Sequence, residues 1–162
     1  MSHAQAPFNG VKTVLVVISS RAMAFDQAGL RNLITHAYAG AVVFFVSVSG
    51  DPVGVAAPSK VDLVIDFTEP GARQSKFFAF NMRGAGRFVV GRKTGWFYRK
   101  SKYDRVYDAS SDENCPRDYL EGEAWAQKRV LELAGIQVVR HGGVTRDLSK
   151  EIASTLPPMQ NR

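Results

Sequence analysis

Apolar runs alternate with amphipathic stretches along this chain, which predicts strands alternating with helices. Three runs are predicted to be buried strands, namely Thr13–Ile18 (TVLVVI), 41–48 (AVVFFVSV) and 61–67 (VDLVIDF). Continuous runs of this kind are typical of strands covered on both faces of a parallel sheet. Shorter strands are predicted at 87–91 and 105–108, and a last edge strand at 136–140.

Helical periodicity lies between these strands. In the segment 26–38 apolar residues recur at helical spacing, at Leu30, Leu33, Ile34 and Ala37, and Asp26 falls in the first turn. Further helices are predicted at 73–82, at 145–156, and from Pro116 to Gly135, where Leu120, Ala124, Leu131 and Ala134 would share one face. The segment 50–59 is rich in proline and glycine and is predicted to be a loop.

This alternation predicts an α/β fold built on a single Rossmann-like, doubly wound, mainly parallel sheet. We expect a disordered leader at 1–10, the Rossmann-like domain at 11–141, and a C-terminal helix and tail at 142–162. The length of 162 residues fits one domain with a real core.

The charge of +6 and the pI near 9.7 favour phosphate-rich or membrane-surface partners. The excess is concentrated between 73 and 105, where Asp104 is the only acidic residue. A run of like charges also occurs on surfaces that only face water. The N-terminus lacks the pattern of a signal peptide, and no apolar run approaches the roughly 20 residues of a membrane span. We therefore expect a cytoplasmic protein, with peripheral contact to the inner membrane as a further option.

Cofactor motifs are missing from the sequence. The turn after the first strand, 19–25, contains no glycine, which argues against dinucleotide or ATP binding there. The three histidines are scattered and lack acidic neighbours at ligand spacing, so no metal site is predicted. Cys115 is the only cysteine, which excludes an intramolecular disulfide.

Basic and acidic residues follow the predicted strands. Arg73 and Lys76 begin the helix after the third strand, and Arg92 and Lys93 follow the fourth, so these four could form a patch for an anionic ligand. Asp66 ends a strand, as does Asp108. Such an acid could act as a general base or hold a sugar hydroxyl, or it could cap the next turn. The basic-aromatic segment 94–103 could stack on bases or sugars, or anchor a long connection.

An ordered series of short motifs covers 12–136. It comprises Leu30-Arg31-Asn32-Leu33, Tyr38-Ala39-Gly40, Asp62-Leu63-Val64-Ile65-Asp66-Phe67, Arg73 to Ser75, Gly84-Ala85-Gly86-Arg87, Val90-Gly91-Arg92, Tyr103-Asp104 and Leu133-Ala134-Gly135-Ile136. In this order the motifs resemble the N-terminal half of the ADP-heptose:lipopolysaccharide heptosyltransferases, the glycosyltransferase family 9 group with the GT-B fold.

The resemblance implies one half of a GT-B fold, the half that shapes the acceptor side. Basic residues there would meet the acidic sugars and phosphates of a lipopolysaccharide-type acceptor. Arg21-Ala22 stands where the family carries a Gly-Asp pair with its base, and Asp26, a few residues later, is the candidate substitute beside Asp66. The family's donor-binding half is not found in the chain.

We therefore expect a heptosyltransferase-like acceptor-side domain that is not catalytic alone. ADP-heptose would be used only if a separate donor-domain chain completed the fold, and a homo-oligomer is the other assembly considered. The alternative is a non-catalytic basic α/β module that binds nucleic acid or phosphorylated ligands.

Overall fold

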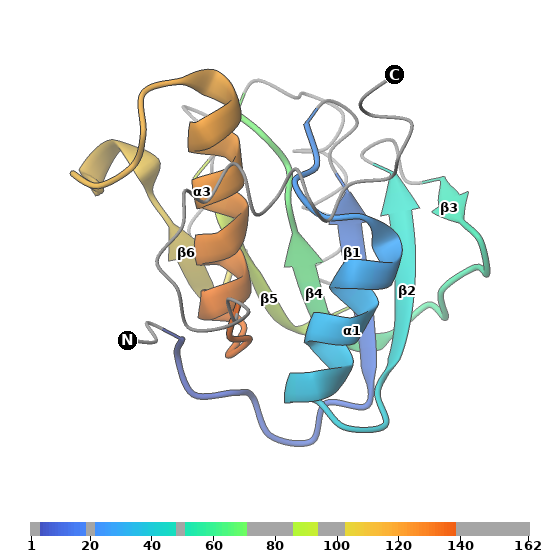
Figure 1. Cartoon of the computed structure of the whole chain (residues 1–162). Coiled ribbons are helices and arrows are strands. Elements are labelled where there is room, and N and C mark those ends of the chain that lie inside the picture. Colours follow the sequence, from blue (N-terminus) through green and yellow to red (C-terminus); the bar gives the residue numbers. More distant parts are fainter. Residues whose placement is uncertain (1–3, 19–21, 48–50, 71–85, 94–102, 139–162) are drawn as a thin grey trace.

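A six-stranded sheet forms the centre of the molecule (Figure 1). The computed structural model describes residues 4–18, 22–47, 51–70, 86–93 and 103–138. The strands are ordered β3-β2-β1-β4-β5-β6, with bounds β1 Thr13–Ile18, β2 Val42–Ser47, β3 Pro52–Val53, β4 Val61–Asp66, β5 Gly86–Arg92 and β6 Arg105–Tyr107. The predicted α/β class is confirmed.

The sheet is mainly parallel, as predicted. β1 lies between β2 and β4, so that Leu15 faces Phe44 on one side and Val64 on the other. β5 and β6 extend the sheet in parallel beyond β4. The order turns back between β1 and β4, because the chain builds outward from β1 to β2 and then returns to the other side of β1. In an open α/β sheet, ligands bind beyond the carboxyl ends of the strands at such a switch point.

The short strand β3 was not predicted. It falls in the segment 50–59 that was expected to be a loop, and it pairs antiparallel with β2 through Val46 and Pro52. Proline lacks a backbone N–H, but an edge strand tolerates this because one side of its backbone needs no partner.

Helix α1 (Gln27–Ala37) begins after Asp26, whose carboxylate accepts a hydrogen bond from the Gly29 N–H at 2.6 Å. Asp26 is therefore the N-cap and not a first-turn residue. Helix α3 (Tyr119–Leu133) begins three residues beyond Pro116, because Asp118 caps it. A short 3-10 helix, η2 (Ala109–Ser111), follows β6.

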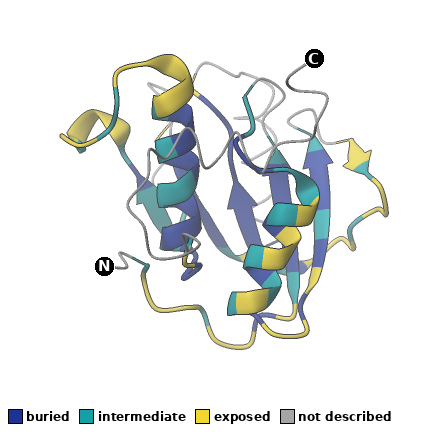
Figure 2. Ribbon diagram, in the orientation of Figure 1, coloured by how far each residue is buried: buried dark blue, intermediate teal, exposed yellow. Residues whose placement is uncertain are grey.

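Both described helices cover the same face of the sheet (Figure 1). Val14 and Val16 point toward them, whereas Leu15 and Val17 belong to a second apolar cluster on the opposite face. The strand interiors and the inner sides of the helices are buried (Figure 2). The helices at 73–82 and 145–156, predicted from the sequence, lie outside the described residues.

The burial pattern of α3 differs from the prediction. Leu120, expected on the buried face, is 66% exposed, while Glu123 and Gln127 are buried among apolar residues. The described part of the predicted edge strand at 136–140, residues 136–138, is not a strand. None of the described helices is long and apolar enough to cross a membrane.

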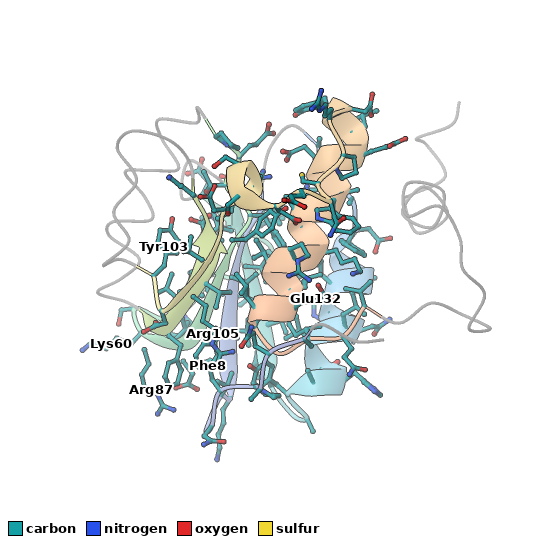
Figure 3. All side chains as sticks on the ribbon, turned by 90° about the vertical axis from the view of Figure 1, so that its left-hand side faces the viewer. Phe8, Lys60, Arg87, Tyr103, Arg105 and Glu132 are labelled. Atoms are coloured by element: carbon teal, nitrogen blue, oxygen red, sulfur yellow. The ribbon has the colours of Figure 1, made fainter. Side chains whose placement is uncertain are left out.

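Residues 4–10 make defined contacts along one end of the molecule, although a disordered leader was expected there. Phe8 stacks on Phe88 with ring centroids 4.4 Å apart, and the Arg105 guanidinium lies 4.0 Å from the Phe8 ring centre. Phe8, Arg87 and Arg105 lie together in Figure 3. Arg105 also donates to the carbonyls of Ala6 and Leu133, at 2.8 and 2.7 Å. These contacts attach the segment to β5, β6 and the end of α3.

Candidate functional site

Buried polar residues gather at the carboxyl ends of β4 and β5, next to the switch point. Asp66, Thr68, Glu69 and Arg92 are each at most 4% exposed. Burying polar and charged groups is costly unless they pair, so a cluster of this kind needs a fixed set of partners.

Arg92 is held by α3. Its Nη1 and Nη2 donate to the two carboxylate oxygens of Glu123 at 2.9 and 2.6 Å. Its Nε donates to the carbonyl oxygen of Thr68 at 2.9 Å. This is the two-pronged geometry in which arginine and carboxylate pair most strongly. Arg92 therefore joins the end of β5 to α3 and to the turn that follows β4.

Asp66 lies at the end of β4 and accepts three hydrogen bonds. They come from the backbone N–H and the hydroxyl of Thr68, the former at 2.9 Å, and from the Tyr103 hydroxyl at 3.0 Å. Burial raises the pKa of Asp66, and the hydrogen bonds and nearby Arg92 oppose this rise. The carboxylate thus fixes the turn after β4, as the capping alternative predicted.

Gly91 allows Tyr103 to reach Asp66. A Cβ at position 91 would lie 2.5 Å from Cε1 of the Tyr103 ring and 3.3 Å from Cβ of Asp66. The first distance is shorter than real carbon contacts permit, so the ring packs directly on the glycine backbone. Sequence reasoning named Gly91 within the motif Val90-Gly91-Arg92 but did not predict this contact.

A polar pair on α3 connects the site to the loop after β1. Glu123 and Gln127 are four residues apart and therefore share a helix face. The Gln127 amide accepts from the Ala24 N–H and donates to the Ala22 carbonyl, both at 2.7 Å. Near the start of α3, the Tyr119 hydroxyl donates to the Glu69 carboxylate at 2.8 Å. Helix α3 thus binds the segments that follow β1 and β4 and the last residue of β5.

The structure separates Arg92 from Lys93, which are two of the four predicted ligand-binding residues. Arg92 is paired inside with Glu123, whereas Lys93 reaches Asp108 at 3.7 Å with its side chain 47% exposed. Successive strand residues point to opposite faces, so adjacent positions do not share a patch here. Arg73 and Lys76 lie outside the described residues. Of the two that the structure describes, Lys93 is thus the residue that faces solvent.

The other acidic candidates act as caps in the structure. Asp26 caps α1 through Gly29. Asp108 accepts from the Ser110 N–H at 3.0 Å and from its hydroxyl at 2.7 Å, and the hydroxyl contact is the main cause of the lowered pKa of Asp108. Within the described ranges, no group of three His, Cys, Asp or Glu residues could hold a metal ion.

Sequence reasoning missed Glu123 and Gln127. It named Tyr103 as a residue that could stack on a ligand or anchor a connection, but not as a partner of Asp66. The available signal was a pair of polar residues, four apart, among the alanines of a helix. Comparison with known proteins adds no further residue, since no protein-family model, curated protein or solved structure matches the chain.

Proposed function

We propose that this chain is a heptosyltransferase-like, acceptor-side domain that binds an acidic glycan at the carboxyl ends of β4 and β5. The observation that carries the proposal is the return of the strand order between β1 and β4, because ligands of open α/β sheets bind beyond the carboxyl ends of the strands near such a switch point. The acceptor would be of the lipopolysaccharide type, with phosphates or acidic sugars.

The positions of the motifs support the same proposal. Leu30 to Leu33 lie in α1, Asp62 to Phe67 form β4 and the residue after it, and Val90 to Arg92 end β5. Leu133 to Ile136 close α3, where Gly135 has a positive φ of 82°. Thus each motif named here lies in a strand of the sheet, in α1, or at the end of α3.

The proposal includes helices on both faces of the sheet. Support comes from the second face, where Leu15, Val64 and Val89 are as well buried as the residues under α1 and α3. It also includes a division of roles at the ligand edge. Arg92 and Glu123 brace the edge, while Lys93, together with Arg73 and Lys76, supplies positive charge to the ligand.

A binding titration tests the proposal. Phosphorylated core oligosaccharide is titrated by calorimetry into the purified chain and into Lys93→Ala, Arg73→Ala and Lys76→Ala. An exposed ion pair such as Lys93 would make with the ligand is worth about 0.2–1 kcal/mol, so its loss should weaken the affinity about 1.4- to fivefold. The matched control is Lys60→Ala, an exposed lysine before the amino end of β4, at the opposite edge.

Two results would overturn the proposal. One is equal affinity for all four variants. The other is displacement of the bound oligosaccharide by single-stranded RNA at a far lower concentration, which would favour the nucleic-acid module.

Activity is tested separately. With ADP-heptose and the acceptor, the chain alone should form no product, because the family places its donor site in the other half. Turnover that Asp26→Asn abolishes would instead show that Asp26 serves as the base.

A further inference from the structure

Tyr119, the first residue of α3, is the one aromatic residue that lies exposed in the part of the chain that the structure describes. Its exposed fraction is 46%. The other described aromatic residues are buried or half-buried, as Phe8 and Phe88 are in their stack. A single exposed ring is common on protein surfaces, so what matters is where this one is held.

Tyr119 is held at the edge of the sheet where β4 and β5 end. Its hydroxyl donates to the Glu69 carboxylate at 2.8 Å, and Glu69 itself is 4% exposed. Glu69 directly follows Thr68, whose carbonyl oxygen accepts from Arg92 at 2.9 Å. The ring therefore lies beside the turn after β4, near the switch point at which open α/β sheets bind ligands.

The hydrogen bond to Glu69 also fixes the direction of the Tyr119 side chain. Tyrosine has few rotatable bonds, so a contact at its tip removes most of its freedom. Since the hydroxyl is directed toward the protein, the exposed part of the side chain is mainly the carbon surface of the ring. A ring that is fixed before the ligand arrives reduces the ordering cost of binding.

The charges next to Tyr119 are mainly negative. Asp118 precedes it and Glu121 follows it in the first turn of α3, both exposed, and Arg117 is the base beside them. A phosphate would be repelled here and is better placed near Lys93. An uncharged sugar ring fits, because its C–H face can pack on aromatic carbon while its hydroxyl groups hydrogen-bond to water or to the acids.

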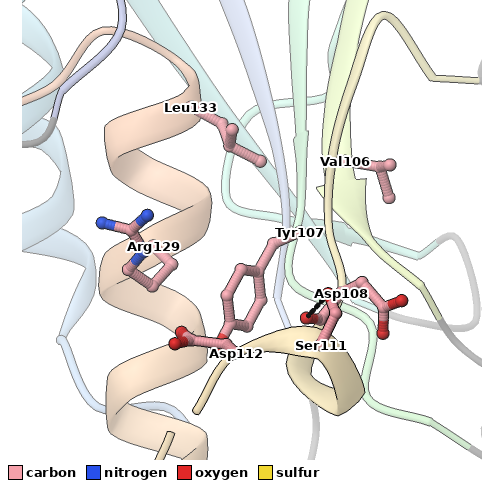
Figure 4. A pocket seen from close by; sticks show the side chains of 7 residues that line it. All are labelled: Val106, Tyr107, Asp108, Ser111, Asp112, Arg129 and Leu133. Carbon is pink, nitrogen blue, oxygen red and sulfur yellow. Dashed lines mark hydrogen bonds between the residues drawn. The ribbon is translucent and has the colours of Figure 1, made fainter. Parts of the chain in front are cut away.

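A hollow of about 310 Å³ between β6 and α3 offers no comparable surface (Figure 4). The acids that line it, Asp108 and Asp112, already accept hydrogen bonds from neighbouring side chains. Tyr107, the aromatic residue of its lining, is only 6% exposed. The hollow therefore lacks the open aromatic ring that Tyr119 presents.

We propose that the Tyr119 ring is the platform on which an uncharged sugar of the acidic glycan packs through its C–H face. Glu69 is the positioning residue, because it holds the phenol hydroxyl and so sets the direction of the ring. The inference rests on the function proposed above, and it adds the residue that selects the sugar next to the phosphate.

The test is a calorimetric titration of phosphorylated core oligosaccharide into the chain and its variants. Tyr119→Ala removes the ring and should weaken the affinity roughly fivefold, as expected for one aromatic contact. Tyr119→Phe keeps the ring and loses the hydrogen bond to Glu69, so it should weaken the affinity only about twofold. Leu120→Ala is the matched control, since Leu120 is 66% exposed and neighbouring helix residues do not share a face.

Saturation-transfer NMR adds a readout that a purely structural role would not change. Irradiation of the aromatic protons of the chain should saturate the C–H protons of the bound sugar. This transfer should fall in Tyr119→Ala and stay unchanged in Leu120→Ala. Because Tyr119 is nearly half exposed, Tyr119→Ala should remain folded, which urea unfolding checks; Tyr119→Leu keeps more apolar bulk and should show the same loss of affinity.

The inference is wrong, while the proposed function stands, if Lys93→Ala weakens the affinity and Tyr119→Ala matches Leu120→Ala in affinity and in saturation transfer. It is also wrong if Tyr119→Phe loses as much as Tyr119→Ala, since the hydroxyl and not the ring would then carry the contact. Binding of adenosine monophosphate that depends on Tyr119, with glycan binding unaffected, would assign the ring to a nucleobase instead. No binding of the oligosaccharide by the parent chain would overturn the proposed function and the inference together.

Discussion

The buried pair of Arg92 and Glu123 allows a quantitative prediction for stability. The replacement is Glu123→Gln, which keeps the size of the side chain and removes its charge. The side chains of Arg92 and Glu123 are buried, with 4% and 11% of their surface exposed, and two hydrogen bonds of 2.9 and 2.6 Å join them. Removing one partner leaves the guanidinium charge buried and uncompensated.

Breaking a buried pair in this way costs about 3–5 kcal/mol. Because glutamine retains one acceptor oxygen for Arg92, we expect the free energy of unfolding to fall by about 3 kcal/mol, at the lower end of that range. This is a large part of the total for a typical domain, about 5–15 kcal/mol.

The measurement is urea unfolding followed by circular dichroism, with the slope checked for two-state behaviour. Glu121→Gln is the matched control, an exposed glutamate in the first turn of the same helix. It should cost about 0.3–1 kcal/mol through the helix dipole. In the double variant Arg92→Met/Glu123→Leu both charges are gone, and much of the loss should be recovered. A loss for Glu123→Gln no larger than that of the control would refute the reasoning.

Three further predictions concern other parts of the fold. Gly91→Ala forces the Tyr103 ring away and should lower the free energy of unfolding by about 1–3 kcal/mol. The loss should be smaller when Tyr103 is replaced by Leu, and an equal loss in both backgrounds would contradict the contact. Burial raises the pKa of Asp66, so the folded protein keeps the Asp66 proton at pH values above the unfolded-state pKa of about 3.9. The free energy of unfolding should therefore fall as the pH rises from about 3.9 through the raised pKa of the folded state. In urea unfolding measured at several pH values, Asp66→Asn should make the free energy of unfolding depend less on pH. An unchanged pH dependence would contradict the raised pKa of Asp66. Phe8→Ala removes the ring that stacks on Phe88 and contacts the Arg105 guanidinium, and should lower the free energy of unfolding by about 1–2 kcal/mol in the same urea assay. No loss would mean that residues 4–10 do not contribute to stability.

Strands were predictable because their signal is local. The run Thr13–Ile18 is apolar at every position except the first, as burial on both faces demands, and the structure has β1 with the same bounds. The helix over Leu30 and Ile34 was also predictable, since both residues are fully buried at helical spacing. Local periodicity is thus enough where a segment simply buries one apolar surface.

Residues with partners far along the chain could not be predicted in this way. Glu123 is buried because Arg92 stands opposite it, and Gln127 because the segment after β1 needs a donor and an acceptor. The apolar pattern of α3 placed Leu120 inside instead, although it is exposed. Phe8 likewise looked like part of a loose leader because the aromatic and arginine residues that hold it come much later in the sequence.

In the candidate site, too, one part could be predicted from the sequence and another could not. The position of the site, beyond the carboxyl ends of β4 and β5, follows from the parallel sheet that the sequence predicts. The role of each side chain does not, since Arg92 and Lys93 are neighbours in sequence but bind Glu123 and Asp108 respectively.

The most direct test of the account is to map where an acidic glycan binds. Phosphorylated core oligosaccharide is added to the ¹⁵N-labelled chain, and the backbone amide shifts are followed. We predict that the largest changes fall on the ends of β4 and β5, at Thr68, Gly91 and Lys93. Changes confined to the opposite edge, around Lys12 and Asp62, or no changes at all, would contradict it.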